Sequence, residues 1–199
     1  MPQQQFEKTI KLIDASNNED PNIETVDGKE WPKELLYSHR MADMIQRFSP
    51  EADEIKKISV HGQHVQRWKS QRKEYSMDRK GYHQWRTNLY KFHAETTADL
   101  MQQAGYDQNA IDRVKKAVGK KDIRNNPDTQ MLEDIAALVF IEHYMLAFAN
   151  KHPEYDEAKW IDIIRKTWRK MSVPAQTFAL EKGIKLPESL VPLIVKAVT

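Results

Sequence analysis

The stretch 63–95 concentrates residue types that bind and transform anionic molecules, namely imidazoles, guanidiniums and indoles. His64, Arg67 and Trp68 stand at positions i, i+3 and i+4, so on a helix they would share one face. A second helical triplet follows one element later: Tyr82, Arg86 and Tyr90. The spacing therefore predicts two helices with matching cationic and aromatic faces.

Positive charge is concentrated in the same region. Residues 66–91 hold eight Lys or Arg against two acids, whereas the whole chain has a net charge of only +2, so the remainder is acidic. A local basic segment of this kind predicts an anionic partner. For the lysines, the simpler interpretation is that they solvate an exposed loop. Arg67 and Arg86 differ because each lies among aromatic residues, where a guanidinium can stack and still present a planar fork to phosphate.

A metal site is one interpretation of the acid Asp134. It lies near the start of an apolar helix, where a carboxylate must be paired, hydrogen-bonded, protonated or bound to metal. With His64 and His93 from two other helices, it forms a set that could hold a divalent transition metal. Whether His39 or His61 joins that set is left open by the sequence.

An ion pair is the competing interpretation of the same acid. Either Glu133 or Asp134 could pair with Arg67 or Arg86 in the interior. The spacing along the chain does not choose between a metal site and a buried ion pair, because both draw charges inward.

Length and composition limit the remaining choices. The chain has 199 residues and no cysteine, which excludes disulfides and thiolate ligands. No apolar run reaches the roughly 18 residues of a membrane span, and the N-terminus lacks a signal peptide's apolar core. We expect a cytoplasmic protein without a membrane partner, built as one domain over 1–199. Within it, 1–31 would form a helix and connector, and 151–199 would form helices packed on the core.

Hydrophobic periodicity predicts an all-α, multi-helix bundle with no strand. After a first helix and a connector over 15–31, Pro32 begins a second helix that ends before Ser49, and Ser49 caps a third that ends near Trp68. Gly105 ends a fourth helix. The fourth helix is expected at about 79–104, a fifth around 111–118 and the central one at 128–150. Three more are expected at 156–171, 174–182 and 187–198.

Several motifs together resemble a known family. They are SHRM, QHVQRW, YSMDRKGYHQWR, FHAE, QMLEDIAALVF and KTWRKMS, and they extend over about 7–180. The chain resembles the family catalogued as domain of unknown function 4202. The resemblance implies a shared fold and a site at the motif positions but names no reaction. Those positions are Gln63, His64, Arg67, Trp68, Arg86, His93, Glu133 and Asp134.

A more distant resemblance is to the HD superfamily of metal-dependent phosphohydrolases, which are also helical. It implies an HD-like bundle whose ligands follow in the order His39, His61 or His64, His93, Asp134. The His-Asp doublet of that superfamily has no counterpart, because Val65 follows His64. The likeness is one of analogy.

The likeness to these phosphohydrolases implies a metal-dependent hydrolase acting on a phosphate-containing small molecule or nucleotide, with the ion held by His64, His93 and Asp134. The metal ion would activate water and polarise a phosphoryl oxygen, Arg67 and Arg86 would clamp the phosphate, and Glu133 would act as general base. The residues expected to contact substrate are Gln63, Trp68 and Tyr82.

The alternative is a non-catalytic module that binds RNA or another anionic ligand, because basic residues interleaved with aromatics suit single-stranded nucleic acid. Affinity for a polyanion would fall steeply with salt, whereas binding of one small phosphate would depend on salt less. Oxygen activation at an iron bound by His and Asp is a third hypothesis, and no residue of the sequence favours it over hydrolysis.

Overall fold

The computed structural model describes residues 2–123, 125–181 and 183–198. Most of these residues are helical and the only sheet among them is a two-stranded hairpin, so the predicted all-α fold is confirmed. None of the described helices is long and apolar enough to cross a membrane. The α-helices are α1 (Pro2–Asn17), α2 (Lys33–Phe48), α3 (Glu54–His61), α4 (Arg79–Ala104), α5 (Gln108–Val118), α6 (Pro127–Val139), α7 (Met145–Asn150), α8 (Glu157–Trp168), α9 (Val173–Leu180) and α10 (Val191–Val198).

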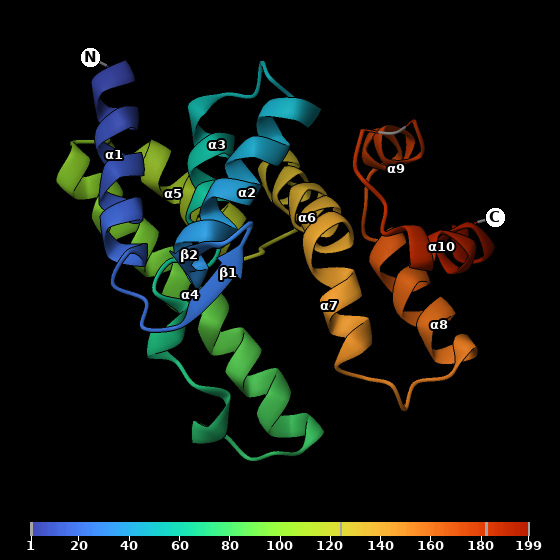
Figure 1. Ribbon diagram of the computed structural model, residues 1–199. Helices are drawn as coiled ribbons and strands as arrows, with labels where there is room; N and C mark the ends of the chain where they lie inside the picture. Colours follow the sequence, from blue (N-terminus) through green and yellow to red (C-terminus); the bar gives the residue numbers. More distant parts are fainter. Residues whose placement is uncertain (1, 124, 182, 199) are drawn as a thin grey trace.

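Helices α1, α3, α4 and α5 enclose one apolar core, whereas buried side chains of α2 belong to a second core. α4 packs against both α1 and α5, and α3 lies against α1, α2 and α5 (Figure 1). The buried side chains at the centre include Ile13, Ile58, Met101 and Val114. The N-terminal half of α4 and the loop before it extend below the other helices in the view of Figure 1.

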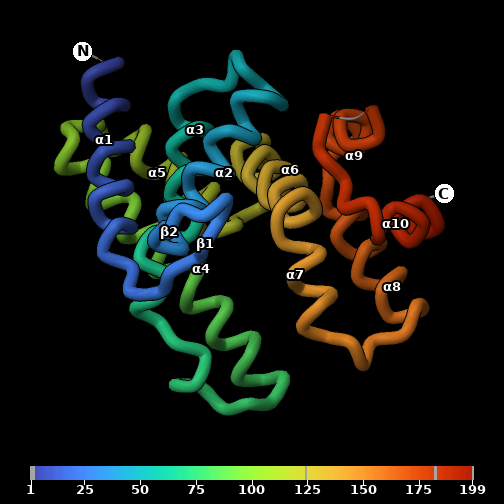
Figure 2. Tube along the Cα trace, in the orientation of Figure 1, coloured from blue at the N-terminus to red at the C-terminus, as the bar shows by residue number. Residues whose placement is uncertain are grey.

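A second core surrounds α6, which is apolar on most faces and lies at the centre of the fold as the sequence predicts. α6 contacts α2, α3 and α5 on one side and α9 on the other. A π-helical turn, η3 (Phe140–Tyr144), joins α6 to α7. The tube in Figure 2 shows the chain passing from α7 into the C-terminal group α8–α10, in which α10 packs on α8.

Aspartates are the N-cap residues of α3, α4 and α5. The side chains of Asp53, Asp78 and Asp107 accept hydrogen bonds from backbone N–H groups in the first turns of α3, α4 and α5, which satisfies donors that the helix leaves open. Gly105 ends α4 with a positive φ of 93°. The bounds of α4 therefore agree with the prediction, but Ser49 does not cap the third helix.

The third helix is shorter than predicted, and this changes the geometry of the site. α3 ends at His61 rather than near Trp68, and Gln66 has a left-handed backbone with φ of 54°. A short 3-10 turn, η1 (Arg67–Lys69), follows. His64, Arg67 and Trp68 therefore do not share a helical face, and the prediction that they do is wrong.

The predicted connector also contains structure that was not expected. Strands β1 (Ile23–Val26) and β2 (Lys29–Pro32) pair antiparallel, with Val26 opposite Lys29. The two-residue turn is Asp27-Gly28, and both residues have positive φ. This conformation matches the right-handed twist of the strands and is favoured by Asp-Gly.

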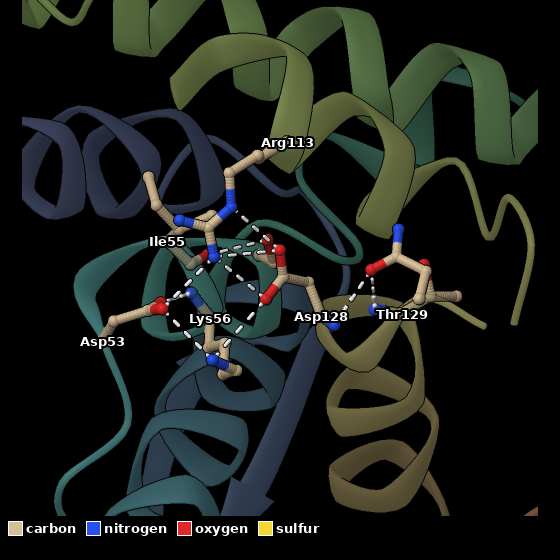
Figure 3. Close-up of polar contacts among 8 residues, drawn as sticks. Asp53, Ile55, Lys56, Arg113, Asp128 and Thr129 are labelled. Carbon is tan, nitrogen blue, oxygen red and sulfur yellow. Dashed lines mark hydrogen bonds and ion pairs between the residues drawn. The ribbon is translucent and has the colours of Figure 1, made fainter. Parts of the chain in front are cut away.

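A charge network ties α3, α5 and α6 together (Figure 3). Arg113 of α5 donates to both oxygens of Asp128 and, at 3.2 Å, to Asp53. Lys56 lies 3.6 Å from the buried Asp128 and 3.1 Å from Asp53. Two cations and two acids thus compensate one another where the three helices meet.

Removing Arg113 should destabilise the fold, because Asp128 is only 8% exposed and would lose its bidentate partner. We expect Arg113→Met to lower the free energy of unfolding by about 2 kcal/mol. Urea denaturation would measure the free energy of unfolding of wild type and variant. The control is Lys166→Ala, which breaks an exposed pair with Asp162 and should cost less than ~0.5 kcal/mol. Equal small losses in both variants would contradict the role given to the network.

Candidate functional site

A cavity of about 430 Å³ lies between α4, the segment after α3 and the η3–α7 region, with Lys120 beyond the end of α5. We call it the central cavity. Among the residues that the structure describes, its lining includes three cations and no carboxylate. They are Gln63, His64, Arg67, Tyr82, Trp85, Arg86, Leu89, Tyr90, His93, Lys120, Phe140 and Phe148.

His93 presents an unpaired nitrogen in the cavity wall. Its Nδ1 lies 2.9 Å from the carbonyl oxygen of Val65. Because a carbonyl only accepts, Nδ1 carries the proton and Nε2 holds a lone pair. Burial lowers the pKa of His93 to about 3, so the ring is neutral. His93 is 2% exposed, and its Nε2 has no hydrogen-bond partner among the residues that the structure describes.

His64 lies between two aromatic rings and two charges. Its ring stacks on Tyr37 with centroids 4.1 Å apart and lies 5.8 Å from the ring of His93. Nδ1 is 3.3 Å from Glu34 Oε2, and Nε2 is 3.3 Å from Arg67 Nη1. Burial and the nearby cations hold the pKa of His64 well below its usual value. The site thus contains two neutral imidazoles.

Glu34 is a functional candidate that the sequence reasoning missed. It begins α2 and is buried, and burial raises the pKa of its carboxyl. Its other oxygen lies 3.9 Å from Arg67 Nε. A second cavity of about 260 Å³ is lined by Glu34 and shares His64, Arg67 and Phe140 with the central cavity.

The two arginines are held by different partners. Arg86 Nε donates to Tyr90 Oη at 2.9 Å, and Nη1 donates to Tyr82 Oη at 3.1 Å, so the predicted stacking in α4 is confirmed. Burial opposes the positive charge of Arg86, but its hydrogen bonds to these two phenols outweigh that effect and raise its pKa. Arg67 lies over the ring of Trp85 at 5.2 Å instead of sharing a helical face with its neighbours.

Glu133 pairs with neither arginine. It accepts a hydrogen bond from Lys120, whose ammonium also lies 5.3 Å from the ring centroid of Tyr90. The expected general base is therefore engaged in an ion pair, and Lys120 joins the cavity as a third cation. Lys120 follows α5 with a left-handed φ of 53°, a detail that no sequence motif indicated.

Asp134 does not join the histidines. Its carboxylate accepts hydrogen bonds from the backbone N–H of Ser172 at 2.7 Å, the Ser172 hydroxyl at 2.6 Å and the Gln130 amide at 2.9 Å. Those donors satisfy it and hold the start of α9 on α6. Within the described parts of the chain, no group of three or more His, Asp or Glu could hold a metal ion. His64 and His93, which face Arg67, do not fit the metal that the sequence led us to expect.

The remaining candidates lie in different places. Gln63 lines the cavity and accepts from Tyr37 Oη at 3.2 Å, whereas the half-buried Trp68 is not among the lining residues. His39 and His61 both contact Asp14, at 3.5 and 2.7 Å, and do not line the cavity. Trp85 supplies the indole in the wall; the sequence suggested it only as one of the aromatics of the nucleic-acid-binding alternative, and not among the three residues expected to contact substrate.

Comparison with known proteins identifies the family. The family model described as "Domain of unknown function (DUF4202)" matches residues 7–194, so the chain belongs to this family. The resemblance to HD-superfamily phosphohydrolases finds no support. Neither the curated proteins nor the solved structures contain a significant match.

The neutral state of His93 should make the fold sensitive to acid. Between pH 6.5 and about 3 the unfolded chain binds a proton at this ring that the folded chain does not, so stability falls as pH falls. On lowering the pH, we expect His93→Gln to lose less of its free energy of unfolding than wild type, by up to about 1.4 kcal/mol per pH unit. Urea titrations at pH 6.5 to 4.5 would test this, with the exposed His83→Gln as control. Parallel pH profiles for wild type and His93→Gln would contradict it.

Proposed function

We propose that this member of the family binds a small phosphate-bearing molecule in the central cavity. The observation that carries the proposal is the buried, unpartnered Nε2 of His93 in a wall that also holds cations. A buried acceptor without a donor costs roughly 1–3 kcal/mol. A ligand hydroxyl, amide or protonated phosphate oxygen would donate to it.

The charge around the cavity favours an anion. Arg67, Arg86 and Lys120 line it, and Glu34 and Glu133 each lie beside one of these cations outside the lining. With both imidazoles neutral, the local balance is positive. A phosphate group entering the cavity could accept charge-assisted hydrogen bonds from guanidinium groups in a setting partly shielded from water.

Aromatic side chains support a ligand with a flat ring. Tyr82, Trp85, Tyr90, Phe140 and Phe148 contribute to the wall. A volume of about 430 Å³ lies in the range of small-molecule sites. An anionic small molecule or nucleotide, as the sequence predicts, therefore matches the size, charge and surface of the cavity.

We propose binding rather than metal-dependent hydrolysis. Asp134 is saturated by Ser172 and Gln130, and Glu133 is engaged by Lys120. The RNA-binding alternative would use the basic segment 66–91, in which five of the eight lysines and arginines are exposed. The enclosed position of His93 favours a small molecule instead, because an internal acceptor cannot contact the backbone of an extended polymer lying on the surface.

Calorimetric titration with phosphate, sugar phosphates and nucleoside monophosphates would test the proposal. We expect Arg67→Met to weaken binding about 30-fold, equivalent to the loss of one charge-assisted contact of ~2 kcal/mol. The matched control is Arg169→Met, an exposed arginine outside the cavity, which should leave affinity unchanged. The ¹⁵N resonance of His93 Nε2 should move when ligand binds, because its lone pair then accepts a hydrogen bond.

Two results would overturn the proposal. One is the absence of binding by every compound of the panel. The other is binding that Arg67→Met leaves unaltered and that does not move the His93 resonance. Binding of RNA with a steep salt dependence, without small-molecule binding, would favour the surface module.

A further inference from the structure

A second recess opens beside the central cavity. It lies between α4 and α5 and has a volume of about 620 Å³. We call it the α4–α5 groove. It shares Tyr90 and Lys120 with the central cavity, so the two spaces adjoin at these side chains. The groove is lined by Thr87, Asn88, Tyr90, Lys91, Ala94, Glu95, Asp112, Lys115, Lys116, Gly119, Lys120 and Lys121.

Three ammonium groups in this groove have no partner within the described parts of the chain. Lys91, Lys116 and Lys121 are exposed, and none of them makes a side-chain hydrogen bond or ion pair there. Lys115 differs, because it pairs with Glu95 at 2.8 Å. Five lysines line the groove against Glu95 and Asp112, so among the described residues its lining keeps a net charge of 5 − 2 = +3.

The junction between the two spaces is itself cationic and aromatic. Lys120 pairs with Glu133 on one side and lies over the Tyr90 ring on the other. A ligand that extends from the cavity into the groove would pass this ammonium and then meet the three free lysines. Positive groups in sequence along a path suit a ligand with anionic groups in sequence.

We infer that the ligand carries at least two linked phosphate groups, one beside Arg67 in the central cavity and the next in the α4–α5 groove. This inference rests on the proposed phosphate binding in the cavity and adds the ligand class. The linkage is that of a polyphosphate chain or of a phosphodiester, which share the chemistry of successive phosphates.

The experiment compares adenosine mono-, di- and triphosphate with a 5′-phosphorylated trinucleotide by calorimetry at low and moderate salt. Wild type should bind at least one multiphosphate probe roughly 10-fold or more tightly than the monophosphate, since a further charge-assisted contact contributes about 1.5–3 kcal/mol. Lys116→Ala/Lys121→Ala should abolish this gain and leave monophosphate affinity within about twofold, because the exposed lysines lie outside the cavity. Lys185→Ala, an exposed lysine elsewhere, is the control and should retain the gain.

The outcomes separate the inference from the proposed function. A gain for di- or triphosphate alone assigns a polyphosphate, and a gain for the trinucleotide alone assigns a phosphodiester; either supports the inference. Monophosphate binding with no gain, or with a gain that the double variant retains, overturns the inference and leaves the proposed function standing. Failure of every probe to bind overturns both.

Discussion

The close approach of Gly62 to Thr97 is the contact on which the geometry of the site depends. A Cβ at position 62 would lie 2.6 Å from Thr97 Oγ1, so a larger residue would push the end of α3 away from α4. The hydroxyl of Thr97 donates to the His93 carbonyl within α4 at 2.8 Å. Because the chain leaves α3 directly against α4, the carbonyl of Val65 reaches His93 and fixes its tautomer.

Charge compensation then determines what the cavity can accept. Glu34 lies near Arg67, Lys120 is paired with Glu133, and Arg86 is held by two phenols. Each cation thus has a partner in the absence of ligand, although only two of the three are matched by a negative charge. Burial next to cations disfavours protonated imidazole. The result is an interior that attracts anions and also offers a neutral hydrogen-bond acceptor, a combination suited to a ligand with both a phosphate and a donor group.

The sequence predicts those parts of this arrangement that rest on local rules. The bounds of α4 follow from capping by Asp78 and from Gly105, and the contacts of Arg86 follow from tyrosines at i±4. The hairpin was missed although Asp27-Gly28 is a typical turn pair. The segments on either side of this pair do not show the alternation of apolar and polar residues that predicts a strand. The end of α3 was missed although Gly62 directly follows its last residue and glycine commonly ends a helix; the close approach of Gly62 to Thr97 of α4, which the sequence does not show, adds to that signal.

The contribution of Glu34 had no local signal, because it lies thirty positions before His64 and meets it only through the packing of α2. The same holds for Asp134, whose partner Ser172 is 38 residues away. A buried carboxylate on an apolar helix looks identical in sequence whether it binds metal, a cation or a backbone amide. Only the tertiary structure supplies the donors that decide among them.

Burial of a polar group therefore does not by itself identify the site. A buried polar group that lacks a hydrogen-bond partner does. Asp134 and His93 are both buried, but three hydrogen bonds satisfy the carboxylate, whereas His93 Nε2 has none. His61 Nδ1 also lacks a partner, yet the recess that it lines is largely apolar, with side chains such as Phe6 and Ile10. Two lysines and Glu7 also line that recess, whereas the cavity at His93 has, among the described residues, three cations and no carboxylate. An open acceptor marks an anion site where the cations around it are not balanced by acids in the same wall.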